Sequence, residues 1–343
     1  MSNNVKKDKT LAKVFSPAKI NLFFAITGRR ADGYHSVFSA NCAVNFGDNL
    51  QVCARDGVGD EILFRFDSLS GCNSCRRGGG GSGANEANGK DNILEQAAPG
   101  LDARDNTVAR ALDAFRAKTG LVKYFSVILE KNIPLEAGFG GGSSNAAAIL
   151  RGVNCLHGNI LPDEDLHEIC RKIGADCPFF LSAAPSIARG IGEICEPLDE
   201  EMATALRNYN WLIFKPNFGV STKVAYQTLG KDFSHLHIGE EEARRRFLCL
   251  RQAMLAGEQL LPLFNTFAAI FFLRHGRLFA LCQRLQEMGA NAMLSGSGSG
   301  FFCLAHRSLP MDAVEKVVKL ELGDGGFVKN CGLLPQNLLV ANG

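Results

Sequence analysis

The chain has 343 residues, 46% of them hydrophobic, and a formal net charge of +2 at pH 7. This length and composition allow one large or two medium globular domains with well-filled cores. A charge so close to zero removes the electrostatic reason to expect nucleic acid or a strongly acidic partner, because that inference needs a large field of one sign. The functional signal must come from local motifs.

Most of the twelve cysteines stand singly within apolar segments, as small hydrophobic residues do, which predicts that they are reduced. Residues 1–15 are partly basic but contain no continuous apolar run, so we expect no secretory signal. The apolar stretch 260–274 is too short for a membrane span and is predicted to be a buried helix. The sequence therefore predicts a cytoplasmic protein that does not interact with membranes.

In the first half of the chain, strand and helix patterns alternate. Residues 18–27 and 124–132 are rich in aromatic and β-branched residues and predict strands. Residues 106–120 and 163–174 carry apolar side chains at helical spacing, and Asp163 is the expected N-cap of the second helix. These patterns predict a mixed α and β structure.

Residues 67–105 differ from the rest of the chain because they are rich in Gly, Ser and Asn. Such a composition buries too little apolar surface to offset the entropy of ordering, so we expect a flexible surface insertion. Cys72 and Cys75 form a lone Cys-x-x-Cys within it. A zinc site usually needs a second pair at matching spacing, so two ordinary loop cysteines are the favoured interpretation.

Beyond a domain boundary expected near residue 200, residues 211–216 predict a strand, and residues 241–256 and 275–288 predict helices. The run Arg244 to Arg246 lies within the first of these helices. A solvated helix face explains this short basic run more simply than a nucleic-acid contact.

The most distinctive segment is IPLEAGFGGGSSNAAAIL, residues 133–150. Its glycines precede two serines and a helix expected from about Ser144, an order that exposes backbone N–H groups to an anion such as phosphate. No Lys-Ser/Thr pair follows the glycines, and no dinucleotide fingerprint is present. Taken alone, the loop is equally compatible with an ordinary helix cap.

Two charged residues stand in apolar surroundings. Lys19 enters the strand PAKINLFFAIT, and Asp176 lies in IGADCPFFL ahead of two phenylalanines. Each would be costly to bury alone, so we expect the two to pair with each other. A second glycine and serine cluster, LSGSGSGFF at 294–302, precedes an apolar strand.

Together, PAKIN, PLEAGFGGGSSNAAA and SGSGSGFF resemble the three motifs of the GHMP kinase superfamily. The resemblance spans the chain from Phe15 to the C-terminal region, apart from the insertion. It implies an α+β fold of two lobes: an N-terminal lobe similar to ribosomal S5 domain 2, residues 1–200, and a ferredoxin-like C-terminal lobe, residues 201–343. The tract GRRADGYHSVFS is more specific and resembles the branch that acts on a cytidine diphosphate ester of methylerythritol.

The resemblance implies transfer of the γ-phosphoryl group of ATP, with Mg²⁺, to the tertiary hydroxyl of that ester. Asp176 would accept the proton of the hydroxyl or orient it. Lys19 would keep Asp176 ionised and attract the moving phosphoryl group. A buried Lys-Asp pair without chemistry is the alternative.

The same resemblance assigns the binding residues. The ATP contacts would be Pro134, Gly138, Gly140, Gly141, Gly142, Ser143, Ser144 and Asn145. Ser143 or Ser144 would lie near Mg²⁺, and no residue is assigned as a metal ligand. The substrate contacts would be Tyr34 and Tyr226, stacking on cytosine, His35 at its polar edge, and Asn21 and Thr222 on the diphosphate or the sugar-like part.

Several residues depart from the superfamily pattern: Glu136 and Ala137 replace glycines, Phe139 replaces leucine or methionine, and Gly300 replaces a frequent threonine. These changes affect the expected strength of nucleotide binding and leave Lys19 and Asp176 intact. A homoserine or phosphomevalonate kinase, or a sensor that binds ATP without transferring phosphate, remains an alternative. We expect a monomer or a weak homodimer.

Overall fold

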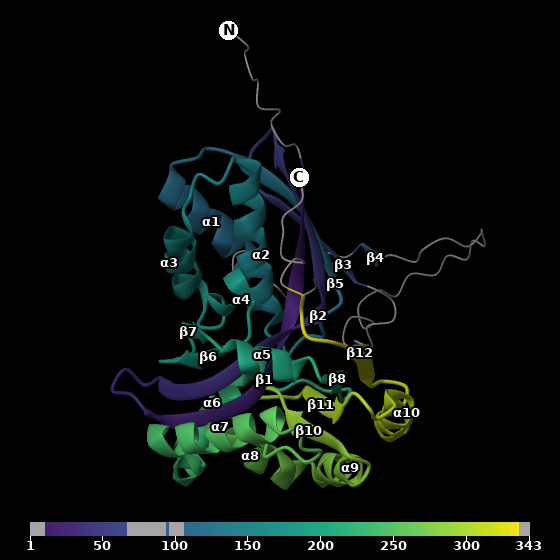
Figure 1. The fold of residues 1–343 in the computed structure, drawn as a ribbon. Coiled ribbons are helices and arrows are strands. Elements are labelled where there is room, and N and C mark those ends of the chain that lie inside the picture. Colours follow the sequence, from purple (N-terminus) through teal and green to yellow (C-terminus); the bar gives the residue numbers. More distant parts are fainter. Residues whose placement is uncertain (1–10, 67–93, 96–105, 336–343) are drawn as a thin grey trace, which may run out of the picture.

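The computed structural model of the chain describes residues 11–66, 94–95 and 106–335. Two sheets, each with its own helices, lie one above the other in Figure 1 and define an N-terminal and a C-terminal lobe. The predicted flexible insertion at 67–105, with Cys72 and Cys75, falls outside these residues except for the short strand β4 (Leu94–Glu95).

The sheet of the N-terminal lobe is built around a long antiparallel hairpin of β1 (Ala12–Arg29) and β2 (His35–Arg55). The strand predicted at 18–27 is confirmed as the central part of β1. The strand order is β4-β3-β5-β2-β1-β9, and β6 pairs with both β2 and β7. The remaining strands are β3 (Glu61–Phe66), β5 (Tyr124–Lys131), β6 (Ser186–Arg189), β7 (Ile194–Pro197) and β9 (Phe264–Asn265).

Four helices lie on one side of this sheet in Figure 1: α1 (Thr107–Thr119), α2 (Gly141–Leu156), α3 (Asp163–Ile173) and α4 (Phe179–Ser182). Both helices predicted from apolar spacing, α1 and α3, are confirmed. Asn106 caps α1 by accepting a hydrogen bond from Val108 N. The N-cap predicted for α3 was wrong, because the helix already includes Asp163 and Pro162 occupies the cap position.

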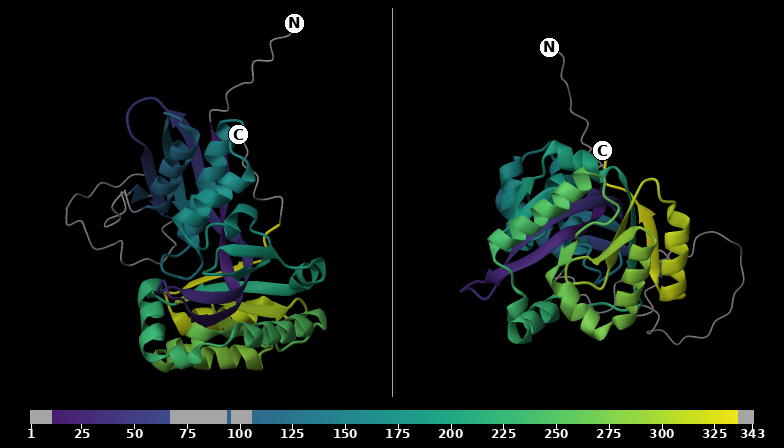
Figure 2. Two further views of the ribbon diagram at one scale, coloured as in Figure 1. Left: turned by 90° about the vertical axis from the view of Figure 1, so that its left-hand side faces the viewer. Right: turned by 60° about the horizontal axis from the view of Figure 1, so that its bottom comes forward.

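The C-terminal lobe has a four-stranded sheet of order β10-β11-β8-β12, and Figure 2 shows several of its helices packed along the sheet on the side away from the N-terminal lobe. The strand predicted at 211–216 and the helices predicted at 241–256 and 275–288 are confirmed as β8, α7 and α9. The strands are β8 (Tyr209–Lys215), β10 (Ala290–Leu294), β11 (Phe301–His306) and β12 (Phe327–Cys331). The helices are α5 (Glu200–Leu206), α6 (Thr222–Asp232), η2 (Ser234–Leu236), α7 (Glu240–Leu255), α8 (Thr266–Arg274), α9 (Gly276–Glu287) and α10 (Met311–Leu322).

The buried helix predicted over 260–274 is only partly correct. Asn265 accepts a hydrogen bond from Phe267 N and so caps a shorter helix, α8, that begins at Thr266. Leu260 is 53% exposed. The apolar run therefore combines a loop, the short strand β9 and a helix, and Pro262 is incompatible with one continuous helix through the run.

The two lobes share one hydrophobic core at their junction. Phe23 of β1 belongs to the same cluster of buried side chains as Trp211 of β8 and Phe302 of β11. Met202, just past the expected boundary near residue 200, belongs to it as well. The architecture confirms the expected two-lobed α+β class, and the exact boundary stays a prediction.

Two smaller expectations can be compared with the described residues. The ten cysteines among them are all free, as predicted. The basic run on α7 pairs with acids of the same helix: Arg244 with Glu240, and both Arg245 and Arg246 with Glu242. No helix in the described ranges is both long enough and apolar enough to cross a membrane.

Candidate active site

The glycine-rich loop leads directly into α2. Gly138 and Gly140 have φ angles of +73° and +70°, a left-handed conformation that is costly for residues with a Cβ. Gly140 also has no room for a side chain, because a Cβ there would lie 2.8 Å from Phe180 Cζ and 2.9 Å from Lys19 Cγ. The loop therefore presents bare backbone at a helix N-terminus, which attracts anions.

The helix begins at Gly141, three residues earlier than the predicted start near Ser144. Ser144 N already donates to Gly140 O at 2.9 Å. The N–H groups of residues 141–143 belong to the first turn, so they have no acceptor within the helix. These three donors, rather than the amide of Ser144, are the ones available to a phosphate.

The side chains of Ser144 and Asn145 point into the N-terminal lobe. Ser144 Oγ accepts a hydrogen bond from Ser16 Oγ at 2.8 Å. Asn145 Nδ2 donates to Ser16 Oγ at 2.8 Å and to Asp48 Oδ2 at 2.9 Å. Both residues are at most 3% exposed. The structure thus separates these two predicted ATP contacts from the others.

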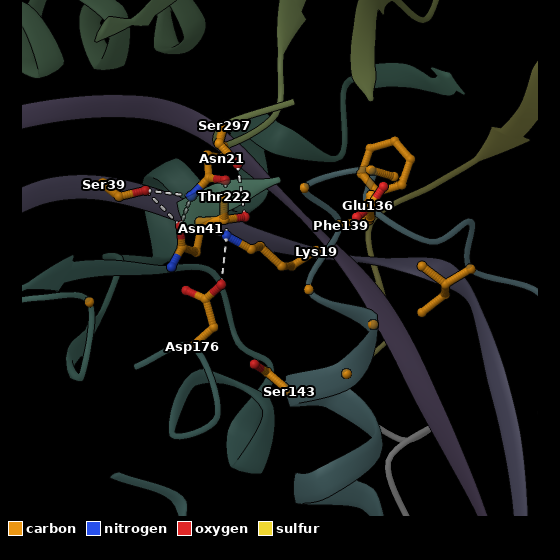
Figure 3. Close-up of a pocket in the computed structure, with 18 of the residues that line it drawn as sticks. Lys19, Asn21, Ser39, Asn41, Glu136, Phe139, Ser143, Asp176, Thr222 and Ser297 are labelled. Atoms are coloured by element: carbon orange, nitrogen blue, oxygen red, sulfur yellow. Dashed lines mark hydrogen bonds and ion pairs between the residues drawn. The ribbon is translucent and has the colours of Figure 1, made fainter. Parts of the chain in front are cut away.

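Lys19 and Asp176 face each other, as expected from their positions in the sequence (Figure 3). Lys19 is only 4% exposed, and its Nζ lies 3.3 Å from Asp176 Oδ2. The same ammonium donates to Asn21 Oδ1 at 2.9 Å. Asp176 lies in the turn between α3 and α4, and its side chain is 40% exposed. The pair therefore combines a buried cation with a carboxylate that a ligand can reach.

A cavity of about 340 Å³ opens beside this pair and is lined by both lobes. Most of the predicted site residues contribute to its wall: Lys19, Asn21, Pro134, Gly138, Gly140, Gly141, Gly142, Ser143, Asp176, Thr222 and Tyr226. We call this the phosphate cavity, because the first turn of α2 forms part of its wall.

The phosphate cavity is also lined by polar residues that the sequence analysis missed: Ser39, Asn41, Thr107 and Lys131. Ser297, which lines it as well, belongs to the second glycine and serine cluster identified at 294–302. Ser39 and Asn41 stand two apart on β2, so alternation in an apolar strand was the signal that could have identified them. Ser297 Oγ lies 3.0 Å from Thr222 Oγ1, which joins the second glycine and serine cluster to the start of α6.

A second cavity, of about 790 Å³, adjoins the first. Its wall includes the predicted cytosine contacts Tyr34, His35 and Tyr226. Tyr34 is 61% exposed, whereas the Tyr226 ring packs edge-on against Phe267 at a centroid distance of 5.0 Å. We call this the tyrosine cavity. The two cavities share five lining residues: Ser143, Asp176, Ile191, Thr222 and Tyr226.

His35 presents a neutral ring to the tyrosine cavity. Its Nε2 is buried and has no hydrogen-bond partner within the part of the chain that the structure describes. Burial, together with the nearby charges of His237 and Arg29, lowers the pKa of His35 below its usual value. A neutral imidazole can donate one hydrogen bond and accept another, which suits the edge of a nucleobase.

Basic side chains also border the tyrosine cavity. Arg29, Lys223 and Lys231 line it, and Asp176 is the acidic residue in the same lining. Lys223 and Lys231 are two helical turns apart on α6, so they lie on one face of that helix. This arrangement favours an anionic ligand.

The structure accounts for two of the departures from the superfamily pattern. A Cβ on Gly300 would lie 2.5 Å from Phe139 Cζ and 2.4 Å from Ala137 O. The large Phe139 therefore occupies the space that a side chain at position 300 would need. Glu136 has a φ of +51°, a conformation that glycine adopts more easily, consistent with glycine being usual there.

The fold and the site define a GHMP kinase, and residues 106–183 match the family described as GHMP kinases N terminal domain. The 4-diphosphocytidyl-2-C-methyl-D-erythritol kinase of Protochlamydia amoebophila is 33% identical over 301 residues, which cover 87% of this chain and 86% of that protein. The enzyme of the same name from Persephonella marina is 29% identical over 309 residues, covering 89% and 94%.

A solved structure supports the same family. The crystal structure of a 4-(cytidine 5'-diphospho)-2C-methyl-D-erythritol kinase superposes with a TM-score of 0.65 at 26% identity. The match covers 93% of this chain and 99% of that one. The chain belongs to the 4-diphosphocytidyl-2-C-methyl-D-erythritol kinase family.

Proposed function

We propose that this chain transfers the γ-phosphoryl group of ATP to the 2-hydroxyl of 4-diphosphocytidyl-2-C-methyl-D-erythritol, a step of isoprenoid precursor biosynthesis. The observation that carries the proposal is the position of Asp176, which lines both cavities and contacts Lys19. A phosphoryl donor in the first cavity and an alcohol in the second would meet at this carboxylate. Holding two reactants together in this way is itself a large part of catalysis.

The phosphate cavity suits the triphosphate of ATP. The first-turn N–H groups of residues 141–143 and the ammonium of Lys19 supply donors and positive charge. Bare backbone at Gly138 and Gly140 allows a phosphate to approach closely. We propose that the remaining members of this wall, including Pro134, contact the rest of the nucleotide.

We propose that Mg²⁺ accompanies ATP, with Ser143 as its contact on the protein. The described residues contain no group of three or more His, Cys, Asp or Glu side chains that could hold a metal by themselves. Mg²⁺ does not need such a group, because it keeps several waters and relies on phosphate oxygens. When bound, the ion neutralises charge on the phosphates.

The proposed chemistry needs a proton acceptor and a cation. The acceptor hydroxyl would give its proton to Asp176 while its oxygen forms a bond to the γ-phosphorus. The bond from that phosphorus to the bridging oxygen breaks, and ADP leaves with the electron pair. Lys19 would stabilise the charge on the transferred group. The products are ADP and the phosphate ester, and the proton passes from Asp176 to solvent.

The tyrosine cavity suits the cytidine diphosphate part of the acceptor. Tyr34 and Tyr226 would flank the cytosine ring, and His35 would read its polar edge. Asn21 and Thr222 would contact the diphosphate or the sugar-like part. The basic residues around this cavity would balance the negative charge of the diphosphate.

The test is ADP release by purified protein with Mg-ATP and, in parallel, 4-diphosphocytidyl-2-C-methyl-D-erythritol, homoserine or phosphomevalonate. We expect turnover with the cytidyl substrate alone. Turnover with another alcohol would keep the Lys19 and Asp176 roles and reject the cytosine assignments. ATP binding without turnover on any acceptor would favour the alternative function, a sensor that binds ATP without transferring phosphate.

The setting of the enzyme also remains a proposal. We propose that it works in the cytoplasm, which is consistent with ten free cysteines among the described residues. We propose that it acts as a monomer or a weak homodimer, and that it uses no nucleic-acid partner. Sedimentation at micromolar concentration would measure the oligomeric state.

A further inference from the structure

Four buried polar side chains form one hydrogen-bonded group on the β1–β2 hairpin (Figure 3). Lys19 and Asn21 are two residues apart on β1, and Ser39 and Asn41 are two apart on β2. Asn21 and Asn41 are direct partners across the two strands. Each of the four is at most 4% exposed, and all line the phosphate cavity. The strand that carries Lys19 is thus joined to β2 by a buried polar network.

The chemistry of Lys19 fixes the direction of these hydrogen bonds. An ammonium has three N–H donors and no acceptor, so Asn21 must turn Oδ1 toward it. The Nδ2 group of Asn21 then needs acceptors, and it donates to Ser39 Oγ at 2.9 Å and to Asn41 Oδ1 at 2.8 Å. Ser39 Oγ lies 2.7 Å from Asn41 Oδ1 and 3.0 Å from Phe23 O, either of which can accept its proton.

We infer that Ser39 and Asn41 are positioning residues for phosphoryl transfer, because they hold the amide of Asn21 with its oxygen facing Lys19. The inference rests on the proposed function. With Asn21 in place, the ammonium is shared between Asn21 Oδ1 and Asp176 Oδ2, and one of its three N–H groups remains for the transferred phosphate.

Removal of the Asn41 acceptor changes this balance. The Asn21 Nδ2 group would lose one of its two buried acceptors, and the amide could rotate to seek another. Lys19 would then lose its neutral partner and move toward Asp176. Its ammonium would occupy the carboxylate that must accept the hydroxyl proton. The expected defect is in the chemical step rather than in binding.

The experiment compares Asn41→Leu with a matched control, Asn154→Leu. Leucine keeps the branched skeleton of asparagine and its number of side-chain heavy atoms, and replaces the polar atoms by methyl groups. Asn154 is likewise buried, at 4% exposure, and it lines neither cavity. Its side-chain amide forms hydrogen bonds with the backbone of Leu161 instead. We expect Asn41→Leu to lower kcat by about ten- to a hundredfold with both KM values nearly unchanged. Asn154→Leu should lose stability and keep its kcat.

Three kinetic results would overturn the inference: a folded Asn41→Leu with normal kcat, a raised acceptor KM at normal kcat, or an equal loss of kcat in Asn154→Leu. The raised KM would mean that Asn41 contacts the substrate directly. Asn41→Asp, which keeps an oxygen acceptor for Asn21, should recover part of the kcat lost in Asn41→Leu. If Asn41→Leu does not fold, Ser39→Ala removes the other acceptor and should give the same kcat defect.

A measurement without turnover separates this inference from the proposed function. Crystal structures of the wild type and Asn41→Leu should show that Lys19 Nζ leaves Asn21 Oδ1 only in the variant. An unchanged contact in the variant would overturn the positioning role, whatever the activity. Absence of ADP release by the wild type with every acceptor would instead overturn the proposed function.

Discussion

Among the described residues of the N-terminal lobe, two buried lysines pair with aspartates, and the two pairs differ in what surrounds the carboxylate. Asp48 is fully buried and binds Lys131, and it also accepts hydrogen bonds from Asn132 N and Ile133 N. In contrast, the side chain of Asp176 is 40% exposed and lines both cavities.

The difference fits a structural role for the Asp48 carboxylate and the reactive role that we propose for Asp176. The Asp48 carboxylate is surrounded by donors from β5, the loop that follows it and α2, including Asn145 Nδ2, so it has little capacity for a ligand. It ties the base of the glycine loop to the sheet. The Asp176 carboxylate keeps an open side toward solvent. Burial of the cation alone would not have distinguished the two pairs, because Lys19 and Lys131 are 4% and 6% exposed.

The largest effect is expected from Asp176→Asn. The substitution keeps the shape of the side chain but removes its charge and its ability to take a proton. We expect kcat to fall by about 10²- to 10⁴-fold while ATP binding stays nearly intact. Steady-state kinetics and a fluorescent-nucleotide titration measure the two quantities. Normal turnover would end the catalytic assignment.

Asp48→Asn should instead act on stability. Removal of one partner of a buried ion pair leaves Lys131 charged without its counter-ion, which costs about 3–5 kcal/mol in the free energy of unfolding. Denaturant unfolding checks this value. Asp113→Asn is the control, because Asp113 forms a surface pair with Arg116 and its side chain is 75% exposed. If Asp48→Asn were stable but as inactive as Asp176→Asn, the contrast between the two pairs would be wrong.

Tyr226→Ala probes the acceptor side of the Lys19–Asp176 pair. Loss of a stacking ring costs about 1–3 kcal/mol per base, so the acceptor KM should rise about five- to 150-fold, with a much smaller change in the ATP KM. Tyr226→Phe keeps the ring and serves as the control. Burial raises the pKa of the Tyr226 hydroxyl, so the side chain is neutral at pH 7 and the control removes no charge. An unchanged KM in Tyr226→Ala would place the base elsewhere.

Sequence periodicity predicted those helices and strands whose bounds are set by residues within or directly next to the element. Helix α1 has apolar side chains at helical spacing, a capping Asn106 and a terminal Gly120 with a φ of +70°, so its bounds could be read within one residue. The start of α2 could not be read in this way. It depends on Gly140, which has a left-handed φ and lies so close to Phe180 and Lys19, from distant segments, that a Cβ would not fit.

The site was predictable where a residue type is costly in its local surroundings. Lys19 in an apolar strand and Asp176 beside two phenylalanines signalled a pair, and the structure brings them together. Ser39 and Asn41 gave no such signal, because neutral polar residues are common in half-buried strands. Ser144 and Asn145 were placed on the nucleotide by resemblance, whereas the helical turn directs their side chains toward Ser16.

The smallest effect is expected from neutralising the basic residues of α6. The double variant Lys223→Gln with Lys231→Gln should raise the acceptor KM about threefold at low salt, because exposed charges contribute little individually. Near 0.15 M salt the Debye length falls to about 8 Å, so the difference should largely disappear. Steady-state kinetics at two ionic strengths measure both effects.

The matched control removes the same net charge from α10, through Lys316→Gln with Lys319→Gln, at residues that line neither cavity. An equal, salt-dependent rise in both double variants would indicate a general effect of net charge. A rise only in the α6 variant would place the diphosphate beside Lys223 and Lys231. A rise that persists at high salt would require direct, desolvated contacts, because screening acts least on buried charges.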